Sequence, residues 1–171
     1  MFSKKTLIIP FSLFVFISTS IQCAHKEEKP DKVLVQQVLN LLHQSASEAN
    51  GKLYFSLFHK NAVFIGTDPN ETWSLNAFRV FAQPYFSKGA GWTYRSRDRH
   101  IYFSDSNQTA WFDEMLDNDQ YGETRGTGVL VKTTAGWKIT QYHLTIPIPN
   151  ELASDITQQI KEKAISPKNQ N

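Results

Sequence analysis

The sequence has little of what several protein classes require. One cysteine in 171 residues excludes a disulfide framework and a thiolate metal cluster. The net charge is only +2, from 18 Lys and Arg against 16 Asp and Glu, whereas proteins that bind nucleic acids need a clustered basic field. The chain also lacks a glycine-rich phosphate loop and a Gly-x-Ser-x-Gly elbow. We therefore expect no nucleic-acid partner and no cofactor.

What is present points to one ordered domain. Hydrophobic residues make up 40% of the chain and aromatic residues 13%, which excludes a disordered protein. A chain of this length holds a single core. Its five histidines, at positions 25, 43, 59, 100 and 143, show no two at ligand spacing with carboxylates, so we expect no metal site.

The first 24 residues have the pattern of a signal peptide. Lys4 and Lys5 form a basic start, and an uncharged apolar run follows over residues 6–18. That run is too short to span a bilayer as a helix but suits a signal sequence. Removing residues 1–24 leaves 147 residues with 16 basic and 16 acidic side chains. We expect an exported, periplasmic or secreted protein whose mature part is neutral and begins with a polar linker over residues 25–32.

The one cysteine leaves two interpretations open. Because Cys23 directly follows the apolar run, it resembles the lipidated cysteine of bacterial lipoproteins. Gln22 is bulky where that signal has a small residue, so ordinary signal-peptidase cleavage near Cys23 or Ala24 is the alternative. A lipid on Cys23 would tether an otherwise soluble domain. We expect no other membrane contact than the signal peptide or this lipid.

Hydrophobic spacing predicts helices first and strands afterwards. Helical spacing covers residues 33–49, 53–58 and 73–86, with a short strand at 61–66. Four long antiparallel strands are predicted at 92–104, 109–116, 122–133 and 137–148. A C-terminal helix over 151–164 precedes a tail that ends at 171. This order predicts an α+β fold in which a curved antiparallel sheet packs on about three helices, leaving a cone whose mouth can hold a small molecule.

Several stretches resemble one protein family. They are LFHKNAVFIGTDP at 57–69, ETWS at 71–74, AWFDE at 110–114, RGTGVL at 125–130 and GWKI at 136–139. Together they resemble the SnoaL-like, or ketosteroid-isomerase-like, branch of the NTF2-like proteins over residues 33–150. The resemblance implies a cone-shaped roll that often forms homodimers. It leaves the activity open, because such proteins include isomerases, cyclases, dehydratases and non-catalytic binding modules.

The resemblance also implies a position for a catalytic base. Isomerases of this kind place a carboxylate near an Asp-Pro pair after the first strand, and Asp68 followed by Pro69 is the nearest match. Their hydrogen-bond donors include a tyrosine on the first helix. The predicted helix over 33–49 contains no tyrosine, which departs from that pattern.

Strand alternation sorts the candidate site residues into faces. In the last strand Trp137 and His143 share a face, and Lys138 lies on the other, so we expect His143 to point into the cone. If Lys132 is outside, Arg125 points inward as well. A histidine can act as base or acid near neutral pH. The alternative for His143 is a hydrogen-bonded position in the wall.

An inward arginine needs an anionic partner, because an unpaired buried charge is costly. The partner of Arg125 is either a bound ligand or one of two carboxylates, Asp113 and Glu114. Alternation puts these two on opposite faces, and Trp111 on the side of Asp113 favours Asp113 as the inward one. A β-bulge would reverse this assignment.

Two further residues lie on the predicted covering helix. We expect Trp73 at the mouth of the cone, either stacking on a ligand or packing in the core, with Arg79 on the same helix. Arg95, Arg97 and Arg99 occupy one face of the strand at 92–104. They form either a ladder for an acidic ligand or the solvated end of the strand.

Three functions remain open from these residues. The first is an exported module that binds a small apolar or acidic molecule in the cone, with Trp73, Arg79, Trp111, Asp113, Glu114, Arg125, Trp137 and His143 as candidate ligand-binding residues. The second is a cofactor-free isomerase, hydratase or lyase that uses His143 or Asp68 as its base. The third is a non-catalytic module that forms homodimers through the exposed sheet face.

Overall fold

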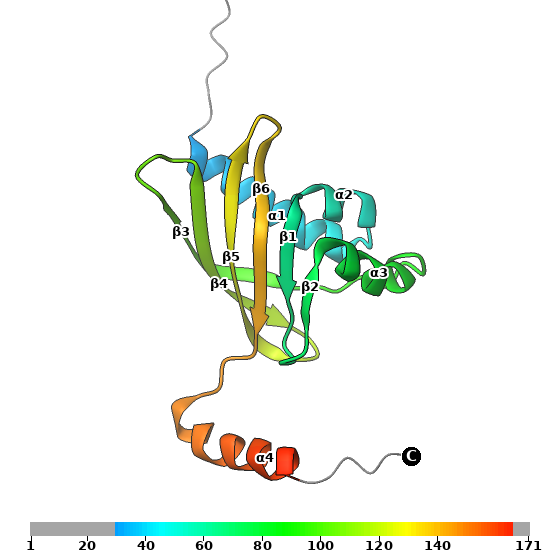
Figure 1. Cartoon of the computed structure of the whole chain (residues 1–171), viewed down its shortest axis with the longest axis vertical. Coiled ribbons are helices and arrows are strands. Elements are labelled where there is room, and N and C mark those ends of the chain that lie inside the picture. The colour runs from blue at the N-terminus through cyan, green and yellow to red at the C-terminus, as the bar shows by residue number, and fades with distance from the viewer. Residues whose placement is uncertain (1–29, 166–171) are drawn as a thin grey trace, which may run out of the picture.

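The computed structural model describes residues 30–165, which form an α+β fold around a curved six-stranded sheet (Figure 1). The helices are α1 (Asp31–Ser47), α2 (Gly51–Ser56), α3 (Leu75–Phe86) and α4 (Ala153–Ile165), with a 3₁₀ turn η1 over Asn150–Leu152. The strands are β1 (Phe58–Ile65), β2 (Thr72–Ser74), β3 (Arg95–Phe103), β4 (Thr109–Asn118), β5 (Gly122–Thr133) and β6 (Gly136–Thr145). The predicted signal peptide at 1–24, Cys23 and the tail at 166–171 lie outside the described residues.

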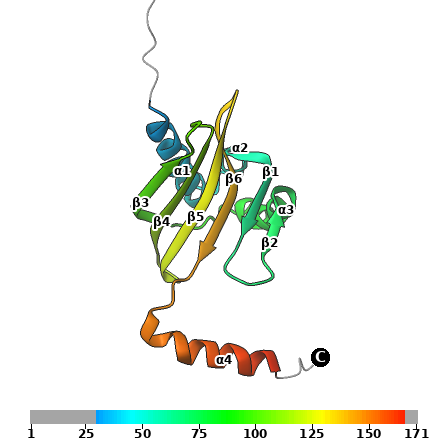
Figure 2. The same cartoon turned by 60° about the vertical axis from the view of Figure 1, so that its left-hand side comes forward.

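The sheet has the strand order β2-β1-β6-β5-β4-β3. β1 and β6 are parallel, and all other neighbouring strands are antiparallel. Helices α1, α2 and α3 lie on one side of the sheet, and in the described part of the chain no helix covers the other side (Figures 1 and 2). The predicted α+β roll is therefore confirmed, with one parallel strand pair added.

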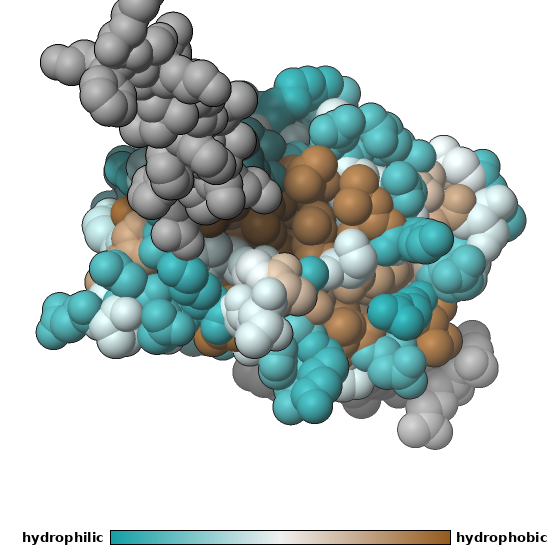
Figure 3. All heavy atoms as spheres, turned by 90° about the horizontal axis from the view of Figure 1, so that it is seen from above, coloured by the Kyte–Doolittle hydropathy of each residue, from teal (hydrophilic) through white to brown (hydrophobic). Residues whose placement is uncertain are grey.

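The core fills the space between α1 and the concave face of the sheet. α1 buries a stripe at three- and four-residue spacing, made of Val35, Leu39, Leu42 and Ala46. β4 buries every second residue opposite it, namely Ala110, Phe112, Glu114 and Leu116. Seen from the end opposite α4, hydrophobic residues also reach the surface in a hollow bordered by hydrophilic ones (Figure 3).

α1 begins two residues before the predicted start, and its first side chain does not cap it. The N-cap is Pro30, which makes no side-chain capping bond. Asp31 instead accepts a hydrogen bond of 2.9 Å from Trp137 Nε1 and pairs with Lys132 Nζ at 2.9 Å. These two bonds lower the pKa of Asp31. They tie the start of α1 to the β5–β6 hairpin.

The predicted helix over 73–86 is a short strand followed by a helix. Residues 72–74 form β2, which pairs antiparallel with β1. α3 then begins at Leu75, because Ser74 is extended and its hydroxyl accepts a hydrogen bond from the Ala77 amide at 3.3 Å. This arrangement places Trp73 on the sheet edge beside α3.

Two β-bulges decide which side chains face the helices. In β3 the register shifts between Arg97 and His100, where Asp98 has a φ of +48°. In β6 Thr140 is an extra residue, since Leu130 pairs with Ile139 and Val129 pairs with Gln141. One inserted residue moves every following side chain to the opposite face.

α4 leaves the body of the fold after β6. It projects beyond the end of the sheet on the segment 146–149 (Figures 1 and 2). Leu152 and Ile160 stay 49% and 59% exposed. Among residues 30–165, none of the helices has the length and apolar character needed to cross a bilayer.

Candidate functional site

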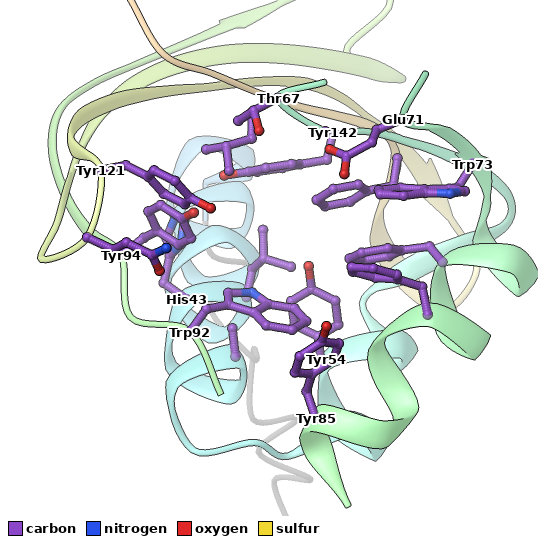
Figure 4. A pocket seen from close by; sticks show the side chains of 18 residues that line it. His43, Tyr54, Thr67, Glu71, Trp73, Tyr85, Trp92, Tyr94, Tyr121 and Tyr142 are labelled. Carbon is purple, nitrogen blue, oxygen red and sulfur yellow. The ribbon is translucent and has the colours of Figure 1, made fainter. Parts of the chain in front are cut away.

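A cavity of about 310 Å³ opens between the concave face of the sheet and helices α1, α2 and α3. Ten of its 18 lining residues are aromatic (Figure 4), so its walls are mainly ring surface: Tyr54, Phe64, Trp73, Phe78, Phe81, Tyr85, Trp92, Tyr94, Tyr121 and Tyr142. Its volume is at the lower end of the range of small-molecule sites.

One wall of the cavity is a set of stacked rings from three elements. Phe64 of β1 stacks on Phe78 of α3 with ring centroids 3.8 Å apart. Trp73 of β2 stacks on Phe78 at 5.7 Å and on Phe81 at 5.0 Å. The stacking fixes the orientation of these rings before any ligand binds, which lowers the ordering cost of binding.

Tyrosine hydroxyls supply polar groups to the cavity. Tyr54 and Tyr142 are only 2% and 4% exposed, and in the described residues neither hydroxyl has a hydrogen-bond partner. Burial raises the pKa of both well above the usual range, and raises that of Tyr94 to about 12. These hydroxyls are therefore neutral and free to donate to a ligand oxygen.

A buried ionic network lies under the cavity at α1. Glu114 is completely buried, and its Oε1 is 2.7 Å from Nε2 of His43, which lines the cavity. Its Oε2 accepts hydrogen bonds from Arg99 Nε at 2.7 Å and from the Ser96 hydroxyl at 2.5 Å. Both partners are on the helix side of β3 because of the bulge at Asp98.

The network keeps Glu114 ionised and oriented. Burial alone would raise the pKa of Glu114, but the hydrogen bond and charge of His43, the charge of Arg99 and the Ser96 hydroxyl together lower it below the usual 4.5. Arg99 also donates through Nη1 to Asn40 Oδ1 at 2.7 Å. The charges of Glu114 and Arg99 cancel, so the floor of the cavity has no net charge when His43 is neutral.

The sequence matches the SnoaL-like domain family over residues 35–149. The protein belongs to this family. A search among curated proteins gave no match.

Solved structures share the fold at low identity. An NTF2-like protein of unknown function from Pseudomonas putida KT2440 is 10% identical over 68% of this chain and 87% of that chain, with a TM-score of 0.58. A domain of unknown function with a cystatin-like fold from Nostoc punctiforme is 16% identical over 82% and 98%, with a TM-score of 0.60. A candidate dehydratase of the NTF2-like family from Streptomyces avermitilis is 14% identical over 70% and 97%, with a TM-score of 0.56. These similarities show the fold alone.

The predicted inward orientation of Arg125 and His143 is wrong. In this SnoaL-like domain Arg125 is exposed on the outer face of β5, because Lys132 lies on the helix side, against Asp31 and Trp137. His143 is on the outer face of β6 because the bulge at Thr140 turns the last residues of the strand over. Neither side chain lines the cavity.

The preference for Asp113 over Glu114 is also wrong. Glu114 faces the helices, and Asp113 lies on the outer face, 42% exposed and 3.2 Å from His100 Nδ1. Trp111, whose position favoured Asp113, is itself on the outer face, 44% exposed and stacked on Tyr102 at 6.0 Å. Asp113 and Trp111 both point away from the cavity, and the prediction failed because it assumed that Trp111 was buried.

The two other predicted aromatic residues have different surroundings. Trp73 lines the cavity, as its predicted position at the mouth requires. Trp137 is 4% exposed in the core at the start of α1, where Asp31 accepts a hydrogen bond from its indole N–H.

The remaining predicted polar residues lie outside the cavity. Arg79 is exposed on α3, with its guanidinium 5.0 Å from the ring centroid of Phe55. Asp68 is exposed in the β1–β2 turn, where its carboxylate accepts the Asn70 amide at 2.9 Å.

The predicted arginine ladder is divided by the bulge in β3. Arg95 and Arg97 form surface ion pairs, for example Arg95 with Asp119 at 2.9 Å. These pairs favour the second alternative, that this end of the strand is exposed to solvent. Arg99 turns inward to Glu114. No group of three or more His, Cys, Asp or Glu side chains within residues 30–165 is arranged to hold a metal ion.

Sequence reasoning missed His43, Glu71 and the tyrosines as site residues. His43 follows the buried Leu39 and Leu42 by four residues and one residue, at the edge of the apolar stripe of α1. Glu114 alternates with Ala110, Phe112 and Leu116, and a carboxylate in a buried alternating set is a signal for an internal ion pair.

Proposed function

We propose that this SnoaL-like protein binds a small, largely apolar ring molecule in the aromatic cavity. The observation that carries the proposal is the combination of preformed ring walls with buried tyrosines whose hydroxyls have no partner in the described residues. A ring system would stack between the walls, while a ligand oxygen accepts from Tyr54 or Tyr142. An acidic ligand has lost its support, because the lining contains no Arg or Lys.

A thermal-shift screen of neutral bicyclic compounds tests this proposal. A ligand present at 100 times its Kd stabilises the folded state by about 2.7 kcal/mol. We expect at least one ring compound with a carbonyl or hydroxyl group to raise Tm by several degrees, and the saturated acyclic compound of equal carbon number to raise it less. A screen in which no ring compound changes Tm or tryptophan fluorescence would reject the proposal.

The His43–Glu114 pair favours a second candidate function, proton transfer on the bound molecule. With Glu114 as its acceptor, a neutral His43 carries its proton on Nε2 and keeps the Nδ1 lone pair as a base. A carbon acid next to a carbonyl would lose its proton to His43, and a tyrosine hydroxyl would stabilise the resulting enolate. His43 thus takes the role that we predicted for His143 or Asp68, in an isomerase, hydratase or lyase without a cofactor.

Deuterium exchange tests the second function without knowledge of the natural substrate. A cyclic ketone such as 2-tetralone is incubated with the protein in heavy water, and deuterium at the carbon next to the carbonyl is followed by NMR. We expect exchange on the order of 100-fold above buffer, and a return to the buffer rate in His43→Gln. His143→Gln should exchange like the wild type. Exchange at the buffer rate in the wild type would leave ligand binding as the function.

A further inference from the structure

The cavity contains one formally charged side chain besides the histidine. Of all its lining residues, Glu71 alone is an Asp, Glu, Lys or Arg. Glu71 lies at the end of the β1–β2 turn, half-buried at the mouth of the cavity. In Figure 4 its carboxylate points into the cavity, between Tyr142 and Trp73.

The turn holds this carboxylate in place. The Gly66 amide donates to the Glu71 carbonyl at 2.8 Å, and the Asp68 amide donates to Glu71 Oε2 at 3.2 Å. A Cβ at Gly66 would overlap Glu71 Oε2, so glycine is what lets the carboxylate lie over the backbone at this point. Glu71 Oε1 has no hydrogen-bond partner among residues 30–165 and is available to a ligand.

When His43 is neutral, no net charge at the floor of the cavity opposes a cation. Arg99 is not part of the lining, and its charge is neutralised by Glu114. Its Nη1 donates a hydrogen bond to Asn40 of α1. Apart from Glu71 and His43, the lining has no ionic side chain, and most of it is aromatic. A cation within about 6 Å of the face of Trp, Tyr or Phe is attracted by the ring quadrupole, most strongly for Trp.

Glu71 and Trp73 are two residues apart in the chain and adjacent at the mouth, so one group can contact both. We propose that the ligand is an organic cation, with an amine or quaternary ammonium group at Glu71 and Trp73 and an apolar ring body in the cavity. This inference rests on the proposed binding function and names the chemical class of the ligand. It assigns Glu71 as the residue that selects for charge.

A matched set of three probes separates charge from shape. The first is (2-naphthylmethyl)trimethylammonium, the second is its neutral isostere with carbon in place of nitrogen, and the third is 2-naphthylmethanesulfonate. Kd values come from titration calorimetry or tryptophan fluorescence. We expect the wild type to bind the cation about ten-fold or more tighter than the neutral probe, and the sulfonate weakest.

Glu71→Gln keeps the size of the side chain and its acceptor for the Asp68 amide, and removes the charge. We expect this variant to bind the neutral probe as the wild type does, while its preference for the cation falls to three-fold or less. Asp105→Asn, in the exposed β3–β4 turn, makes the same charge change away from the cavity and should keep the full preference.

The possible outcomes separate selection for a cation from the binding of a ring molecule in the cavity. If the wild type binds the cation and the neutral probe equally, or if Glu71→Gln keeps the preference, the cationic class is wrong and cavity binding stands. Tightest binding of the sulfonate would also overturn it. If none of the probes binds, the cavity does not accept a two-ring molecule, and both proposals fail.

Discussion

Replacing Glu114 with glutamine should destabilise the fold by about 3 to 5 kcal/mol, the cost of breaking a buried ion pair from one side. Glutamine fits the space, but it leaves the guanidinium of Arg99 without a countercharge. The side chain of Arg99 is only 9% exposed. Chemical denaturation of wild type and variant measures this difference. We expect Tm to fall by on the order of 10 °C.

The neighbouring residue is a matched control. Asp113→Asn makes the same chemical change one position away, on the outer face, where the carboxylate is 42% exposed beside His100. An exposed pair of this kind contributes about 0 to 1 kcal/mol. Equal effects of the two substitutions would contradict the assignment of faces in β4.

The Glu114 network also sets an acid limit to stability. Since the pKa of Glu114 is lowered in the folded protein, its contribution is fully present above the usual 4.5 and is lost as pH falls through the folded value. Wild type should therefore lose Tm steeply below about pH 4.5, and Glu114→Gln should lose less over the same range. Parallel curves of Tm against pH for the two proteins would contradict a lowered pKa of Glu114 in the folded state.

Replacing Trp73 with alanine should weaken the binding of a ring ligand about 10- to 100-fold. The indole forms one wall of the cavity, and removing an aromatic anchor from an interface costs about 2 kcal/mol or more. Trp73→Phe keeps a ring in the wall and should keep most of the affinity. Fluorescence titration with a ligand from the thermal-shift screen measures all three proteins.

Trp111→Ala is the control for Trp73→Ala. Trp111 is also partly exposed and stacked on a neighbouring ring, but it lies on the outer face of the sheet. Its removal should leave Kd unchanged, as should Arg125→Ala and His143→Ala, whose side chains face outward. Loss of binding in Trp111→Ala with normal binding in Trp73→Ala would show that the ligand binds on the outer face of the sheet and not in the cavity.

The fold could be predicted from the sequence because its signals extend over many residues. The α1 stripe of Val35, Leu39, Leu42 and Ala46 has helical spacing, and each long strand is bounded by turn residues. Boundaries were less certain: residues 72–74 look like the start of α3, yet they pair with β1 because three extended residues suffice for a sheet edge.

The site could not be predicted with the same success because it depends on single residues. The extra residue at Thr140 turns His143 to the outer face of β6 and Tyr142 toward the cavity. The hydrophobic pattern of the sequence does not reveal such a bulge. The bulge at Asp98 likewise separates Arg99 from Arg97. The assignment from Lys132 was wrong for a different reason, since its ammonium group pairs with Asp31 on the helix side of the sheet.

The central claim is that the aromatic cavity is a ligand site, and a crystal structure of protein purified from the cells that naturally produce it tests this most directly. We predict density for a small molecule between Trp73 and Trp92, with a polar atom within hydrogen-bond distance of a tyrosine hydroxyl. A cavity that holds only ordered water, bonded to Tyr54 and Tyr142 in protein that binds none of the screened ring compounds, would contradict the claim.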